Sequence, residues 1–116
     1  MHGLSTDAVL DLLRDVAAEV ITPRFRALAA GEVIEKNPGD LVTIADRTAE
    51  HEAREWIAAR FPGDAVLGEE YGFSGDTRQR RWFIDPIDGT KTFVRGVPLW
   101  GTMIAVAQDD VVIAGA

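Results

Sequence analysis

Two aspartates three positions apart, Asp85 and Asp88, are the residues of this chain best suited to chemistry. They follow the apolar run 82–84, which is typical of the end of a buried strand. Pro86 restricts the backbone between them, and Gly89 permits a close or unusual backbone approach just after them. The spacing therefore predicts two hard oxygen ligands held at a strand end, which suits Mg²⁺.

A second pair of acids, Glu69 and Glu70, follows Gly68 after another short apolar run, residues 65–67. Two strand ends of this kind could bring four carboxylates together, and such a cluster is hard to keep ionised without a metal ion. The plainer alternative is that Asp-Gly forms an ordinary turn which Asp85 caps. The apolar run before the turn and the Gly-Glu-Glu segment upstream favour the metal site.

The motifs Gly68-Glu-Glu70 and Asp85-Pro-Ile-Asp88-Gly-Thr90 resemble those of the inositol monophosphatase superfamily of Mg²⁺-dependent phosphatases. Lys36 and the segment 40–46 are similar to the region upstream in that family. The continuation over 89–105 looks most like the histidinol-phosphate phosphatase branch, although Thr92 stands where that branch commonly has Asn or Ser. The resemblance implies a Mg²⁺-dependent phosphomonoesterase, with histidinol phosphate as the best substrate and inositol monophosphate as the alternative.

The resemblance also implies roles for individual residues. Glu69, Asp85 and the backbone carbonyl of Ile87 would bind one Mg²⁺, and Asp85 would bridge to a second metal held by Asp88. Asp46 and Thr90 match the pair that activates water, and Glu69 would orient the same water. For Asp46 the competing reading is a helix cap without a catalytic role.

Substrate contacts are expected from Asp88, Gly89, Thr90 and Lys91. The backbone N–H groups of Gly89 and Thr90 would face the phosphate if a helix begins there, and Lys91 would add a cation. For Lys91 alone, a solvated surface position is the better reading. Lys36 has two open readings, a lysine near the site or a surface ion pair with a neighbouring acid. Glu70 is an outer partner or a ligand bridged by water.

Composition excludes several classes of function. The chain has 116 residues, a net charge of −7 and no cysteine, so it offers neither a basic surface for nucleic acid nor disulfides or thiolate zinc sites. No apolar stretch approaches the length of a membrane span, and no signal-peptide pattern occurs at the N-terminus. We therefore expect a cytoplasmic protein that binds a small phosphate monoester and neither nucleic acid nor membrane.

Members of the family that this chain resembles are roughly twice as long, and they carry a further metal-binding Asp in a Trp-Asp motif. No Trp-Asp occurs here, because Trp56, Trp82 and Trp100 precede other residues. Residues 1–116 are therefore expected to be the N-terminal portion of one metal-dependent phosphatase domain, inactive alone. We expect it to form a homodimer or to associate with the missing C-terminal half; the alternative is a catalytically incomplete metal-binding fragment.

The elements that would position the site are expected in an α+β fold, a layered α/β sandwich of the inositol monophosphatase type. Two helices are expected to pack on one face of an antiparallel or mixed sheet. The pattern predicts a helix capped by Ser5 or Thr6 and interrupted near Pro23 with a restart over 24–28, and then a strand over 33–36 and a turn over 37–40. A second helix is expected from a Thr43–Asp46 capping box to Arg60. The rest of the chain is expected to form a mobile loop over 71–81, an irregular or extended segment over 91–99, and a hairpin of 102–107 with 111–114.

Overall fold

The computed structural model describes residues 4–116 except 77 and 79. Its α-helices are α1 (Thr6–Val16), α2 (Ile44–Arg60) and α3 (Thr90–Val94). Its strands are β1 (Val33–Asn37), β2 (Asp40–Thr43), β3 (Ala65–Gly68), β4 (Gly72–Ser74), β5 (Arg81–Asp88), β6 (Gly101–Gln108) and β7 (Val111–Gly115).

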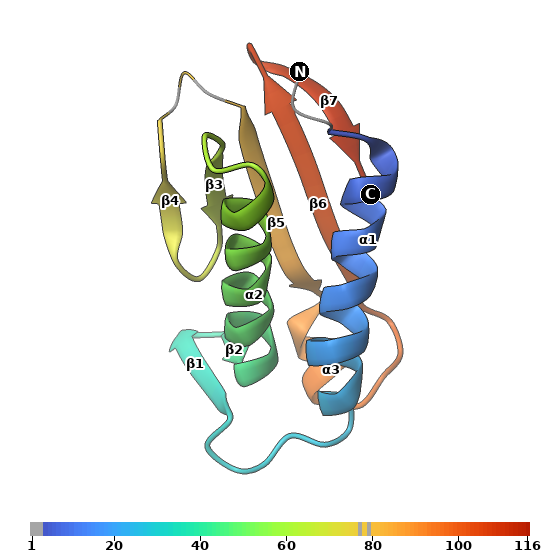
Figure 1. The fold of residues 1–116 in the computed structure, drawn as a ribbon. Helices are drawn as coiled ribbons and strands as arrows, with labels where there is room; N and C mark the ends of the chain where they lie inside the picture. Colours follow the sequence, from blue (N-terminus) through green and yellow to red (C-terminus); the bar gives the residue numbers. More distant parts are fainter. Residues whose placement is uncertain (1–3, 77, 79) are drawn as a thin grey trace.

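A mixed sheet of five strands, in the order β4-β3-β5-β6-β7, forms the centre of the structure. The pair β3–β5 is parallel, and the other neighbours are antiparallel. Helices α1 and α2 lie side by side across one face of this sheet, and the separate β1–β2 hairpin lies beyond the N-terminal end of α2 (Figure 1). The predicted α+β arrangement, with two helices on one face of a mixed sheet, is confirmed.

The core lies between the helices and the sheet. Along β5 the side chains alternate, so that Trp82 and Ile84 are buried while Phe83 and Asp85 are half-buried. Small residues of α2, Ala49 and Ala53, are almost completely buried and allow the helix to approach the sheet closely. The register of β5 therefore sends Asp85 to the face opposite the helices.

The N-terminal helix changes its winding before Pro23. Ser5 caps it, with the Ser5 hydroxyl accepting a hydrogen bond from the amide of Ala8 at 3.1 Å. A π-helical turn, Ala17–Ile21, and a 3-10 turn, Thr22–Arg24, follow α1. The missing N–H of proline accounts for this loss of α-helical bonding. The expected restart over 24–28 is wrong, since Arg26 has a φ of 61°.

Two other local predictions also need correction. The segment expected to be irregular or extended over 91–99 begins with α3, which follows Gly89 directly. Part of the expected loop over 71–81 is the edge strand β4, which pairs with β3; residues 77 and 79 of that loop lie outside the described residues. Within the part of the chain that is described, no helix is both long and apolar enough to cross a membrane.

Candidate active site

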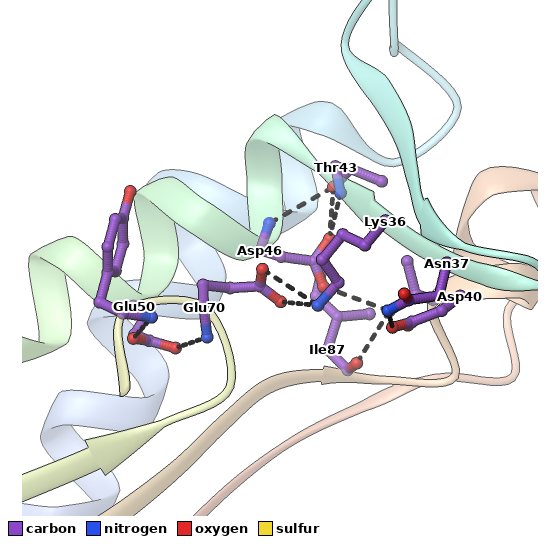
Figure 2. Close-up of polar contacts among 10 residues, drawn as sticks. Lys36, Asn37, Asp40, Thr43, Asp46, Glu50, Glu70 and Ile87 are labelled. Carbon is purple, nitrogen blue, oxygen red and sulfur yellow. Dashed lines mark hydrogen bonds and ion pairs between the residues drawn. The ribbon is translucent and has the colours of Figure 1, made fainter. Parts of the chain in front are cut away.

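Asp46 is fixed at the N-terminus of α2 by the predicted capping box. Its Oδ2 accepts hydrogen bonds from the backbone amide and the hydroxyl of Thr43, both at 2.7 Å. The Thr43 hydroxyl in turn accepts from the amides of Ala45 and Asp46, at 3.1 and 3.3 Å. The capping role expected for Asp46 is therefore confirmed, and one carboxylate oxygen remains for other partners (Figure 2).

That second oxygen faces Thr90. The Thr90 hydroxyl lies 3.2 Å from Oδ1 of Asp46 and 3.2 Å from the carbonyl oxygen of Ile87. The site thus joins three residues named from the sequence that belong to three elements, Asp46 to α2, Ile87 to β5 and Thr90 to α3. The helix cap and the contact with Thr90 coexist in one carboxylate.

Gly89 makes this turn possible. It has a φ of 92°, in the left-handed region that residues with a Cβ rarely adopt. A Cβ at this position would lie 2.9 Å from the carbonyl oxygen of Leu99 and 3.0 Å from the hydroxyl of Thr92. The Thr92 hydroxyl also hydrogen-bonds the carbonyl groups of Gly89, at 2.8 Å, and of Leu99. Thr92 therefore closes the turn, a role that the sequence did not indicate.

The acidic residues at the two strand ends are only partly gathered. Glu69 and Asp85 line one groove on the face of the sheet opposite the helices. Glu70 instead pairs with Lys36, whose Nζ lies 3.1 Å from Oε1 of Glu70 (Figure 2). The ion pair expected as one reading of Lys36 is present, and its partner is one of the acids that follow β3.

Among the described residues, no three acidic or histidine side chains converge closely enough to hold a metal ion. The tight cluster expected of Glu69, Glu70, Asp85 and Asp88 is therefore not formed as these side chains stand. Like-charged carboxylates repel one another, and Glu70 is paired with Lys36 instead.

Asp85 nevertheless fits a metal ligand. Its Oδ1 is buried and has no hydrogen-bond partner within residues 4–116, leaving 77 and 79 aside. A buried carboxylate oxygen without a partner is costly. A divalent cation takes oxygen ligands of this kind and would satisfy it.

The pKa values of the acidic residues also favour a bound cation. Burial, together with the charges of Asp88, Asp46 and Glu70, raises the pKa of Asp85. Burial and the charge of Asp85 raise the pKa of Glu69, although Lys36 opposes this. These carboxylates therefore repel one another when ionised, and a bound cation would relieve the repulsion.

The remaining predicted residues lie on the surface of the molecule. Asp88 and Lys91 are exposed, as the surface reading of Lys91 expected. The Lys91 ammonium lies near the tip of the β1–β2 hairpin, where a Cβ on Gly39 would be 3.6 Å from Nζ. Lys91 can therefore bridge the hairpin tip and α3.

Glu50 is a further residue of this region that the sequence patterns did not indicate. It is completely buried on α2, four residues after Asp46, and it accepts hydrogen bonds from the backbone of the Glu69–Glu70 turn. The available signal was the position itself, because i and i+4 share a helix face and Ala49 and Ala53 mark that face as buried.

Known proteins share this arrangement. The model of the inositol monophosphatase family matches residues 5–116. The chain belongs to the inositol monophosphatase family. It is 48% identical over 105 residues to a histidinol-phosphatase of Mycobacterium tuberculosis, covering 89% of this chain and 39% of that protein. It is 38% identical over 121 residues to an inositol-1-monophosphatase of Mycobacterium leprae, covering 99% of this chain and 41% of the relative.

Solved structures agree with the family assignment. An IMPase from Thermotoga maritima superposes with a TM-score of 0.83 at 31% identity, over 94% of this chain and 41% of that structure. The chain therefore spans about two fifths of the length of each of these three proteins.

Proposed function

We propose that this chain supplies the metal-binding and water-activating part of a Mg²⁺-dependent phosphomonoesterase. The observation that carries the proposal is the buried, unpartnered oxygen of Asp85, which lies in the same groove as Glu69, within the described residues. Membership of a phosphatase family supports the reaction class.

Glu69, Asp85 and the Ile87 carbonyl would hold one Mg²⁺, and Asp85 and Asp88 would hold a second. When bound, such ions lower the pKa of a coordinated water and stabilise charge on the phosphoryl and leaving-group oxygens. The Ile87 carbonyl oxygen lies 3.2 Å from the Thr90 hydroxyl, so this segment would place the hydroxyl beside the metal ligands.

Thr90 and Asp46 would remove a proton from the attacking water. With its hydrogen directed to Asp46 at 3.2 Å, the Thr90 hydroxyl keeps a lone pair for a water molecule. As the water oxygen bonds to phosphorus and the ester P–O bond breaks, the proton of the water passes to Thr90 and that of Thr90 to Asp46. The alcohol oxygen leaves with the bonding electron pair and takes its proton from solvent, and Asp46 later returns its proton to solvent. The N–H groups of Gly89 and Thr90, together with Asp88 and Lys91, would bind the substrate.

Histidinol phosphate is the substrate that we propose, because the relative at 48% identity is a histidinol-phosphatase. An inositol monophosphate is the second candidate, favoured by the relative at 38% identity.

A phosphate-release assay with Mg²⁺ would distinguish the two candidate substrates. The enzyme for this assay is a fusion of this chain to the unmatched region of the Mycobacterium tuberculosis relative. We expect phosphate to be released faster from histidinol phosphate than from inositol monophosphate. Release from histidinol phosphate at the same rate or more slowly would reject histidinol phosphate as the substrate.

We further propose that the groove face of the sheet is covered in the working enzyme. Leu67, Phe73 and Met103 are 38, 44 and 46% exposed, and cross-strand pairing places Leu67 beside Phe73 and Phe83 on one face. The occupant would be a second copy or the region that the longer relatives carry outside the match. The 116 residues alone are then inactive, and a metal-binding fragment without catalysis is the alternative.

A further inference from the structure

Glu50 is a buried acid that the proposed chemistry does not use. Its side chain is completely buried on α2, one turn after Asp46. Its Oε1 accepts from the backbone amide of Glu70 at 2.9 Å, and its Oε2 accepts from that of Tyr71 at 2.8 Å. Figure 2 shows this carboxylate reaching from α2 to the turn after β3.

Gly68 leaves room for this carboxylate because it has no side chain. A Cβ at Gly68 would lie 2.3 Å from the carboxyl carbon of Glu50 and 2.4 and 2.5 Å from its two oxygens. No residue with a side chain fits there while Glu50 keeps its place. The Glu50 carboxylate therefore lies against Gly68, just before Glu69, and binds the two backbone amides that follow Glu69.

Arg54 completes the attachment on the β4 side. Its Nε lies 3.1 Å from Oε2 of Glu50, and its Nη1 lies 3.0 Å from the hydroxyl of Ser74. Its Nη2 donates to the carbonyl of Gly72. The guanidinium therefore balances the buried charge of Glu50 and binds the same β3–β4 hairpin.

We propose that Glu50, braced by Arg54, is a positioning residue that sets the backbone at Glu69 so that the Glu69 carboxylate can meet the same divalent cation as Asp85. The inference rests on the proposed function. A buried ion pair is poor support for stability alone, because well-packed apolar residues often serve as well. Bonds from a charged carboxylate to two consecutive amides, by contrast, fix the geometry of a turn.

The substitution Glu50→Gln tests the role with little change in volume. An amide presents only one acceptor oxygen, so its NH₂ group would face a backbone N–H. The matched control is Asp64→Asn at the other end of β3, where Asp64 accepts from Arg80 Nε at 2.6 Å and from Trp82 Nε1 at 2.7 Å. Both variants convert an arginine-paired carboxylate to an amide, and the Asp64 side chain is 11% exposed where that of Glu50 is completely buried.

The measurement is Mn²⁺ binding to the 116-residue chain, followed by electron paramagnetic resonance, since Mn²⁺ takes the same oxygen ligands as Mg²⁺. We expect Glu50→Gln to weaken binding about 10- to 100-fold, the usual effect of losing a group that orients a ligand. Hydrogen exchange at the amides of Glu70 and Tyr71 should accelerate in the same variant. Asp64→Asn should change neither quantity.

Unchanged Mn²⁺ affinity in folded Glu50→Gln would overturn the inference and leave the proposed function intact. Wild-type binding that is absent, or insensitive to Asp85→Asn, would overturn the proposed function and the inference with it. If circular dichroism shows that Glu50→Gln does not fold, Mn²⁺ binding to Arg54→Lys tests the proposal instead. We expect this substitution to weaken Mn²⁺ binding about tenfold, and wild-type affinity there would reject the proposal.

Discussion

The hydroxyl of Thr90 lies 3.2 Å from Oδ1 of Asp46, a residue 44 positions earlier in the chain. The other oxygen of Asp46 caps α2 through Thr43. One carboxylate therefore couples the start of α2 to the start of α3, and the position of Thr90 depends on a helix cap.

This coupling predicts different effects for two substitutions of Thr90. In the fusion enzyme, Thr90→Val keeps the side-chain shape and removes the hydroxyl, so phosphate release should fall by about 10²- to 10⁴-fold. Thr90→Ser keeps the hydroxyl and should retain most of the activity. Mn²⁺ affinity should be similar in both, because the hydroxyl is not a proposed ligand. Equal loss of activity in both variants would show that the methyl group, rather than the hydroxyl, matters.

A second prediction concerns the backbone of the turn. Gly89→Ala should lower the free energy of unfolding by about 1–3 kcal/mol, because Gly89 has a φ of 92° and a Cβ would meet the Leu99 carbonyl. Gly63→Ala is the control, since a Cβ there meets nothing within 4 Å and the backbone is not left-handed. Urea denaturation followed by tryptophan fluorescence measures both. A Gly89→Ala variant as stable as Gly63→Ala would be incompatible with this turn.

Stability should depend on pH through Asp85. Because burial and neighbouring charges raise its pKa in the folded chain, the native state binds more protons than the unfolded state above about pH 3.8, the ordinary value. The contribution of Asp85 to stability therefore falls as pH rises through its raised pKa. In chelator, Asp85→Asn should be more stable than wild type at pH 7, and this advantage should shrink as pH is lowered.

Thermal melts of the two proteins between pH 4 and 8 check this prediction. Asp64→Asn is the control, since it removes a carboxylate that is satisfied by Arg80 and Trp82. A constant difference between wild type and Asp85→Asn across the whole range would contradict the assigned electrostatics.

Local signals in the sequence predicted much of the fold and the helix cap that holds Asp46. The Thr43–Asp46 spacing encodes a capping box because both partners lie within one helical turn. Gly89 marked an unusual backbone, and the apolar run 82–84 marked the buried strand that ends in Asp85 and Asp88. These features depend on neighbours in the chain, so periodicity and turn chemistry were sufficient to find them.

The features that were missed depend on partners far away in the sequence. Glu50 looks like an ordinary helical acid until the fold brings Gly68 and the amides of Glu70 and Tyr71 to it. The edge strand β4 exists through its pairing with β3, in a segment that is otherwise glycine-rich and polar. Single-sequence patterns carry little information about such contacts.

The exposed groove face predicts association. Met103 pairs across the sheet with Asp85 and is 46% exposed on that face. Met103→Lys should reduce self-association of the chain, or its binding to the supplied remainder of the relative, because it places a charge in an apolar contact. Val97→Lys is the control, as Val97 is 37% exposed outside the sheet. Analytical ultracentrifugation would show the difference, and identical sedimentation of both variants would exclude this face as the interface.

Isothermal titration of the 116-residue chain with Mg²⁺ and Mn²⁺ tests most directly whether Asp85 belongs to a metal site. We predict saturable binding to the wild type that is lost in Asp85→Asn and weakened in Glu69→Gln. Binding should be unchanged in Asp64→Asn. Binding of equal strength in wild type and Asp85→Asn, or no binding to the wild type, would contradict the assignment of these carboxylates to a divalent cation.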